Sequence, residues 1–153
     1  MKKVWIILLL GILVTGCGTE NRGSDDEPVN GNVKGGQGIV AGEMAASMAE
    51  ISPLIFQYEV KNQTEQEVNL KFTTSQRFDY SVKTKDGHEV FLFSSVASFL
   101  QALGEETIKQ GEALTYKIDL KELALEKGEY TLTVWMVPQG GEKYAVTQEF
   151  TVE

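Results

Sequence analysis

The side chains that could do nucleophilic or acid–base chemistry are few in this sequence and stand far apart. A serine nucleophile needs a base within hydrogen-bonding reach, and the only histidine, His88, follows an Asp86-Gly87 pair that predicts a hairpin turn. A single cysteine, Cys17, rules out an internal disulfide, and one histidine rules out a His-rich metal site. Carboxylates are scattered over predicted turns and outer strand faces, and no GxxxxGK(S/T) phosphate loop occurs. We therefore expect no enzyme activity, no metal and no cofactor.

Cys17 stands at the end of a predicted export leader. Lys2 and Lys3 precede an apolar run, residues 4–14, which suits a signal peptide but is shorter than the roughly 20 residues that span a bilayer. The run ends in LVTGC, which resembles the lipobox of bacterial lipoproteins. We expect residues 1–16 to be a lipoprotein signal peptide, and Cys17 to be lipidated and to hold the protein on the outer face of the bacterial cytoplasmic membrane. The alternative is a plain secretory leader whose cysteine is incidental.

Composition divides the remaining chain into a tether and one domain. Residues 17–38 are rich in glycine and poor in large apolar residues, so we expect a disordered tether after the lipidated cysteine. Residues 39–153 have the size of one ordinary domain. The net charge is −8, and without Lys2 and Lys3 the chain has 12 basic and 22 acidic residues, a charge of −10. This balance excludes nucleic acid as a partner, because nucleic acid is bound through clustered Lys and Arg.

Alternation of apolar and polar residues predicts that the domain is all-β. In the clearest stretch, apolar residues at positions 68, 70 and 72, and again at 78, 80 and 82, alternate with polar ones. Seven or eight such strands are separated by turns, without the long crossovers of a parallel sheet. This pattern favours an immunoglobulin-like Greek-key antiparallel β-sandwich. Residues 39–51 fit either a helix or a strand.

Several side chains have a predicted place in this sandwich. Arg77 and Asp79 alternate with aromatic residues, so both should point away from the core and could pair on the outer face. Gly128 and Tyr130 resemble the tyrosine corner of immunoglobulin-like sandwiches, in which the hydroxyl bonds to upstream backbone. Trp135 is expected on or beside the core, but it is out of phase with the inward residues of its strand; the alternative is that it faces outward, where it would be a candidate contact residue.

Two short segments allow more than one interpretation. Asn62-Gln63-Thr64 matches a glycosylation sequon, but after a bacterial leader we interpret it as turn chemistry. Ser94-Ser95 could cap a helix, because apolar residues follow at positions 96, 99, 100 and 103 before Gly104. We expect this one short helix to plug an open end of the sandwich rather than to bind a partner.

With the strands placed, the domain resembles the Bacillus intracellular proteinase inhibitor (BsuPI) family from about residue 40 to the C-terminus. The most specific part is the run Ser75, Gln76, Arg77, Phe78, Asp79 and Tyr80; the wider pattern adds the Asp86-Gly87 and Gln110-Gly111-Glu112 turns, Phe99-Leu100-Gln101 and Gly128-Glu129-Tyr130. The resemblance implies a β-sandwich with an early edge strand, so residues 39–51 are expected to form that strand. It also implies inhibition of a subtilisin-like serine protease. The founding inhibitor is cytoplasmic, whereas this chain has an export leader, so its target would lie outside the membrane.

The resemblance does not say which residues contact a protease. We interpret the motif residues 75–80, with Gly128 and Tyr130, as structural. Loops on a rigid frame usually carry binding, so the candidate contact loops are residues 94–106 and 138–143. The candidate contact residues are Phe99, Pro138, Gln139, Gly140 and Gly141. The alternative function is a non-inhibitory protein-binding module of the cell envelope, whose partner is another envelope protein.

Overall fold

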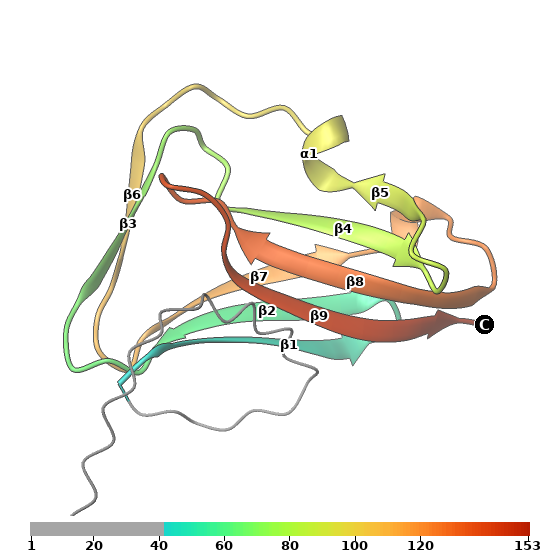
Figure 1. Cartoon of the computed structure of the whole chain (residues 1–153), viewed down its shortest axis with the longest axis horizontal. Helices are drawn as coiled ribbons and strands as arrows, with labels where there is room; N and C mark the ends of the chain where they lie inside the picture. The colour runs from blue at the N-terminus through green and yellow to red at the C-terminus, as the bar shows by residue number, and fades with distance from the viewer. Residues whose placement is uncertain (1–41) are drawn as a thin grey trace, which may run out of the picture. The chain divides into compact units, whose positions relative to one another are not determined.

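The computed structural model describes residues 42–153, which form antiparallel β-structure with one short α-helix and one 3-10 turn (Figure 1). In chain order the elements are β1 (Met44–Ser52), β2 (Ile55–Asn62), β3 (Val68–Phe72), β4 (Phe78–Thr84), β5 (Glu89–Leu92), α1 (Phe93–Val96), β6 (Gly104–Ile108), β7 (Ala113–Asp119), η1 (Lys121–Leu123), β8 (Gly128–Met136) and β9 (Lys143–Val152). The predicted signal peptide, Cys17 and the tether lie outside the described residues. Within residues 42–153, no helix has the length and apolar character to cross a membrane.

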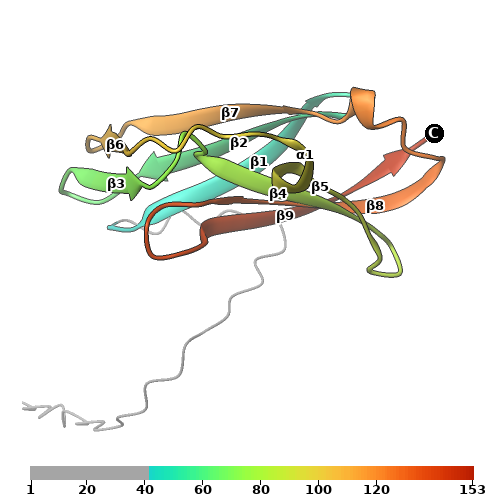
Figure 2. The same ribbon diagram turned by 90° about the horizontal axis from the view of Figure 1, so that it is seen from above.

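Two sheets face each other across the core. Strands β1, β2 and β7 form one sheet, and β5, β4, β8 and β9 form the other, each in the order given (Figure 2). The remaining pair, β3 and β6, extends from the end of the first sheet and turns away from the direction of β2 and β7 (Figure 1). The predicted all-β antiparallel sandwich is confirmed.

The core is built from side chains at alternate positions along the strands, which point inward. In β2, for example, Phe56, Tyr58 and Val60 are fully buried, whereas the intervening Gln57 is exposed. The Tyr58 hydroxyl donates to the backbone oxygen of Tyr144 at 2.6 Å, which ties the first sheet to β9 in the second. The full set of buried apolar residues is Phe56, Tyr58, Val60, Leu70, Phe72, Tyr80, Val82, Ile108, Ile118, Leu120, Tyr130, Leu132, Val134, Met136 and Phe150.

Asn62 organises the bend at which the β2–β7 ladder gives way to β3 and β6. Its side chain is fully buried, and its Nδ2 donates to the backbone oxygens of Gln66 and Ile108, both at 2.7 Å. Its Oδ1 accepts the backbone N–H of Thr64 at 2.9 Å and lies 2.7 Å from the Thr64 hydroxyl. These bonds define a local turn of the kind that Asn and Thr favour. The interpretation of the sequon as turn chemistry is confirmed.

The predicted tyrosine corner is confirmed at the start of β8. The Tyr130 hydroxyl donates to the backbone oxygen of Glu126 at 2.9 Å, four residues upstream, and the ring is buried. The ring also stacks on Phe150 of β9, with 5.6 Å between centroids. The hydroxyl and the ring together hold the connection before β8 against the second sheet.

Two further predictions agree with the strand positions. Residues 44–52 form β1, which pairs with β2 alone and is therefore an edge strand of its sheet; positions 39–41 lie outside the described residues. Trp135 has the outward alternative, because it lies on the outward phase of β8, between the buried Val134 and Met136. Alternation was thus sufficient to orient these residues.

One short helix is present, as predicted, but its expected extent over residues 96–103 is wrong. The α-helix is a single turn, Phe93–Val96, and residues 97–103 have neither helical nor strand structure. Leu100 and Leu103, the expected inward residues, are 75% and 87% exposed, so this segment does not plug the sandwich. Gly104, which was expected to end the helix, is instead the first residue of strand β6.

Candidate functional site

The connection between β3 and β4, residues 73–77, lies beside both loops that the sequence named as candidate contact loops. The backbone N–H of Ser75 donates to the oxygen of Leu100 at 2.9 Å, and the Leu100 N–H donates to the Ser75 hydroxyl at 3.0 Å. On its other side, the backbone oxygen of Arg77 accepts the N–H of Val137 at 3.1 Å. The motif region therefore bonds to the first loop and to Val137, the residue directly before the second loop.

Arg77 links this connection to β6. Its Nε donates to Glu106 Oε1 at 2.7 Å, and its Nη1 donates to the Thr74 oxygen at 3.0 Å. The guanidinium lies 4.6 Å from the centre of the Phe72 ring, and a Cβ at Gly104 would overlap it. The predicted pairing of Arg77 with Asp79 is therefore wrong. The partner is Glu106, on a strand that was not expected.

Asp79 is buried, which also differs from the outward position expected for it. Its Oδ1 accepts the backbone N–H groups of Tyr80 at 2.9 Å and of Ser94 at 3.0 Å. A buried carboxylate is tolerated where such donors satisfy it. Asp79 thereby fixes the start of α1, and with it the chain that leads into residues 97–103.

A row of aromatic rings packs α1 and the following residues onto β4. The Phe93 ring lies 5.0 Å from Tyr80 and 5.9 Å from Phe78, nearly parallel to both. Phe99, a predicted contact residue, is half-buried with its ring edge-on to Phe93 at 5.7 Å. Offset and edge-on pairs of this kind each contribute about 0.5–1.5 kcal/mol beyond their burial. Phe99 therefore anchors the segment that contains it.

Tyr116 of β7 joins this row from the opposite sheet, because its ring lies 4.7 Å from that of Phe78. Burial, and secondly the negative charge of Glu106, raise the pKa of Tyr116 to about 12; the charge of Arg77 opposes this rise. Burial also raises the pKa of Tyr58. Both hydroxyls therefore stay protonated in the folded protein at a pH at which they ionise in the unfolded chain.

We expect the free energy of unfolding to fall as the pH rises above about 10, where unfolded tyrosine loses its proton. For Tyr116 the loss should continue until about pH 12, with a slope of at most about 1.4 kcal/mol per pH unit, reduced by solvent screening. Denaturant unfolding between pH 9 and 12 measures this slope. Tyr116→Phe should reduce the slope and leave the remainder to Tyr58, Tyr80 and Tyr144, whose pKa values burial also raises, whereas equal slopes in the two proteins would contradict the assignment.

Residues 97–103, here called the apolar segment, run over the surface between α1 and β6 (Figure 1). Leu100 and Leu103 are the two most exposed large apolar residues in the described part of the chain. Ser75 binds both the N–H and the carbonyl oxygen of Leu100, and the Phe99 ring holds the upstream end of the segment. It presents large apolar side chains on a fixed backbone.

The second candidate loop is polar and tightly turned. Pro138 is buried, whereas Gln139, Gly140 and Gly141 are exposed. The Gly141 N–H donates to the Pro138 oxygen at 3.2 Å, and both glycines have positive φ angles, 102° and 109°, which side chains disfavour. The Gln139 N–H donates to the Lys71 oxygen at 2.6 Å. This loop is braced like the apolar segment, but it offers little apolar surface.

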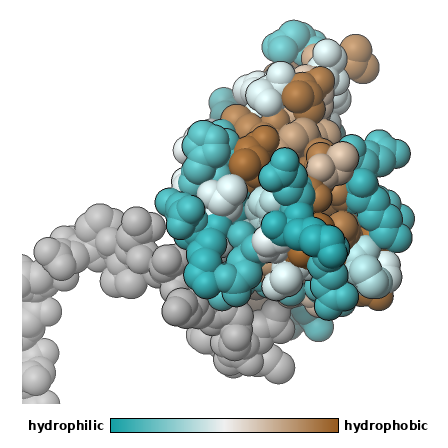
Figure 3. Space-filling model, turned by 90° about the vertical axis from the view of Figure 1, so that its right-hand side faces the viewer, coloured by the Kyte–Doolittle hydropathy of each residue, from teal (hydrophilic) through white to brown (hydrophobic). Residues whose placement is uncertain are grey.

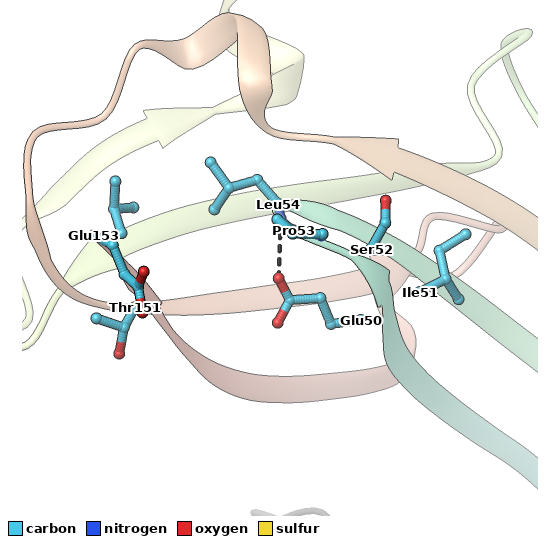
Figure 4. A pocket seen from close by; sticks show the side chains of 8 residues that line it. Glu50, Ile51, Ser52, Pro53, Leu54, Thr151 and Glu153 are labelled. Carbon is cyan, nitrogen blue, oxygen red and sulfur yellow. Dashed lines mark hydrogen bonds between the residues drawn. The ribbon is translucent and has the colours of Figure 1, made fainter.

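The surface has two other features, an apolar area and a pocket. On the face shown in Figure 3, apolar side chains gather in the upper and central parts within a hydrophilic border; Val90 of β5 and Val96 of α1 are among the exposed apolar residues of the domain. An open pocket lies between the β1–β2 turn and the C-terminal residues (Figure 4). Its Glu50 carboxylate accepts the Leu54 N–H at 2.9 Å, which supports the positive φ of Leu54 (Figure 4). The pocket's carboxylate thus has a role in the turn.

The remaining groups that could do chemistry are dispersed. Among residues 42–153, no three His, Cys, Asp or Glu side chains gather as metal ligands. His88 is exposed in the β4–β5 hairpin, where its backbone oxygen accepts the Thr84 N–H at 2.8 Å. Cys17 lies outside the described residues.

The structure places the predicted site residues in two groups. Ser75, Arg77, Phe78, Asp79 and Tyr80 brace the loops or the chain next to them, whereas Gln76 bonds, within residues 42–153, only to Thr74 and Phe78. On the loops, Gln139, Gly140 and Gly141 are exposed, Phe99 is half-buried and Pro138 is buried. Leu100 and Leu103 were interpreted as core, and Glu106 and Gly104 were not recognised. The signal that could have corrected this is the length of the predicted helix, because helices shorter than about 12 residues are marginal unless a face is buried.

A β-sandwich that presents an exposed apolar segment on a hydrogen-bonded frame belongs to the class of small binding domains. A family model described as intracellular proteinase inhibitor, BsuPI, matches residues 42–141. The chain belongs to this family, and the resemblance inferred from residues 75–80 is confirmed. The match ends just before β9 begins at Lys143. No curated protein matches the chain.

Proposed function

We propose that this chain inhibits a subtilisin-like serine protease outside the cytoplasmic membrane, to which a lipid on Cys17 anchors it. Membership of an inhibitor family supports the proteinase-inhibitor activity. The observation that carries the mode of action is the apolar segment, because Leu100 and Leu103 are exposed on a backbone that Ser75 holds in place. A loop ordered before binding loses little conformational entropy when it enters a cleft.

Charge and size agree with a protein partner. The acidic balance of the chain, 22 acidic against 14 basic residues, disfavours nucleic acid, and an interface of about 1,600 Å² is typical of protease–inhibitor pairs. The backbone of the inhibitor surface that binds the protease should move little on association. The domain itself supplies no reacting group in this scheme.

The inhibitor proposal is tested by adding the purified full chain to several purified secreted subtilisin-like proteases and measuring residual activity on a chromogenic peptide. Stoichiometric loss of activity is the expected result. Flat activity curves at micromolar excess of the chain across the panel would refute the proposal. If the chain then bound an envelope protein that is not a protease, the alternative of a non-inhibitory binding module would take its place.

The anchor is tested separately in cells. Cys17→Ser removes the thiol that would carry the diacylglycerol, so the chain should appear in the medium or remain unprocessed. One acyl chain binds a membrane only marginally, whereas two or three hold a protein stably. Fractionation with an antibody against the domain measures the outcome. A variant that is processed and still membrane-bound would contradict lipid anchoring and leave the inhibitor proposal untouched.

A further inference from the structure

The apolar segment shows two features together that a surface connection does not need. It exposes Leu100 by 75% and Leu103 by 87%, although each leucine would gain about 1.5–3 kcal/mol from full burial. Its backbone is nevertheless fixed in the middle, where loops are usually most mobile. Exposed leucines on a fixed backbone are suited to filling pockets in another molecule.

The fixation is centred on Leu100. Its N–H donates to the Ser75 hydroxyl at 3.0 Å, and its carbonyl oxygen accepts the N–H of Ser75 at 2.9 Å and that of Ala102 at 3.0 Å. With both polar groups of its backbone turned toward the domain, Leu100 has only its side chain free for a partner. Phe99 on one side and Gly104 of β6, which pairs with Phe72 of β3, on the other hold the ends of the segment.

The direction of the Leu100 carbonyl has a chemical consequence. A serine protease cleaves a peptide bond whose carbonyl oxygen enters its oxyanion hole, where backbone N–H groups bind it. The Leu100 oxygen already has two N–H donors within the inhibitor. The Leu100–Gln101 bond is therefore withheld from the nucleophile while the leucine side chain remains available.

The composition of the segment restricts the protease. Residues 97–103, Ala-Ser-Phe-Leu-Gln-Ala-Leu, contain no Lys or Arg, so they do not complement a specificity pocket with an acidic residue at its base. Leu100 and Leu103 are three residues apart and can reach two neighbouring subsites, at most about 10 Å from each other. Both side chains fit subsites that accept large aliphatic groups.

We infer that the apolar segment is the protease-binding element, with Leu100 and Leu103 in two apolar subsites of the cleft and the Ser75–Leu100 bonds protecting the segment from cleavage. This inference rests on the proposed inhibitor function and names the residues and the protease specificity that function requires. Ser75 is a positioning residue in this arrangement. The polar loop at residues 138–143 is a supporting contact at most.

The test measures inhibition constants for the full chain and its variants against a subtilisin-like protease of apolar specificity, with trypsin as the second enzyme. Leu100→Ala and Leu103→Ala should each weaken inhibition about 10-fold, and the double variant about 100-fold. Neither the unmodified chain nor any of these variants should inhibit trypsin. Ile51→Ala is the matched control, because Ile51 is an apolar residue, 56% exposed, near the end of β1 and before the turn into β2 (Figure 4).

A second measurement follows the integrity of the segment. In Ser75→Ala the Leu100 N–H loses its acceptor, so on long incubation the protease should cut within residues 97–103 faster than in the unmodified chain, as mass spectrometry of the fragments would record. Unfolding curves verify that the variants keep their stability, as expected for exposed positions. Equal cutting of the two proteins would overturn the protective role of the Ser75 hydroxyl, because Ser75→Ala keeps the backbone N–H bond to the Leu100 oxygen.

The outcomes separate the two proposals. If the unmodified chain inhibits and the leucine variants inhibit equally well, the inference is overturned and the inhibitor function stands. If inhibition of trypsin exceeds that of the apolar-specific enzyme, the assigned specificity is wrong. If the unmodified chain inhibits no protease, both proposals fail.

Discussion

Asn62→Ala should lower the free energy of unfolding by about 3 kcal/mol, because it removes every hydrogen bond of a fully buried amide. The Ile108 oxygen would lose a donor at 2.7 Å in a buried setting, and the Thr64 N–H would lose its acceptor. Unsatisfied buried groups cost about 1–3 kcal/mol each, and partial solvation of the turn at Gln66 reduces the total. The bend from β2 into β3 would lose the side chain that defines it.

Urea unfolding followed by tryptophan fluorescence measures the change. Asn69→Ala is a matched control, because Asn69 lies on β3 but is exposed, and its Oδ1 accepts only the Thr107 hydroxyl at 2.6 Å. The control should change stability by less than about 0.5 kcal/mol. A comparable loss in the two variants would mean that the buried network is not the cause.

Arg77→Ala should cost about 2 kcal/mol, since it removes the ion pair with Glu106, the bond to Thr74 and the contact with the Phe72 ring. The two charged side chains are 23% and 33% exposed, so the ion pair is only partly screened. Arg77→Lys should recover less than half of the loss, because an ammonium group neither stacks on an aromatic ring nor donates from several nitrogens as a planar guanidinium does.

Gly104→Ala offers a sharper check on the same contact. A Cβ at position 104 would displace the Arg77 guanidinium, so the substitution should destabilise the unmodified protein by about as much as Arg77→Ala does. In the Arg77→Ala background the obstacle is gone, and alanine in a strand should be neutral or stabilising by about 0.5–1 kcal/mol. A double-mutant cycle therefore predicts a coupling energy of at least about 1.5 kcal/mol. Additive effects would show that the guanidinium is free to move.

Most of the strands could be predicted because their inward residues are apolar and their outward residues are not. In β2 and β8 the alternation is nearly regular, and the Gly128–Tyr130 pair marks the corner before β8. Hairpin turns have equally local causes, as at Asp86-Gly87, where Gly87 has a φ of 84°. Such features depend on short stretches of chain and are therefore visible in the sequence.

The apolar segment and β6 were missed because their structure depends on distant residues. The apolar spacing at 96, 99, 100 and 103 satisfies a helical pattern, but Ser75 binds the Leu100 backbone in place of a helical partner. In β6 the one fully buried apolar residue is Ile108, and Glu106 turns to Arg77, so alternation was too weak to reveal a strand. Asp79 likewise finds its donor at Ser94, fifteen positions away.

The candidate site was therefore only partly predictable. The motif at residues 75–80 was recognised as a bracing element, and the two loops that it braces were named. The exposed leucines were not, because an apolar residue in a sequence predicts burial, and only the coordinates show that Leu100 and Leu103 remain in solvent. The residues proposed for binding thus lie where the apolar pattern fails to predict burial.

The strand order also governs how the domain reaches its native state. Phe56 pairs with Ile118 and Phe78 with Met136, so the central ladders join residues about 60 positions apart in the chain. Closing such long loops must precede any gain from the contacts, and sandwiches of this kind fold in milliseconds to seconds rather than microseconds. Strand β9, which supplies Phe150 and the backbone oxygen that binds Tyr58, is the last of the described strands in chain order. The contacts that join the two sheets are therefore complete only after β9 has paired with β8.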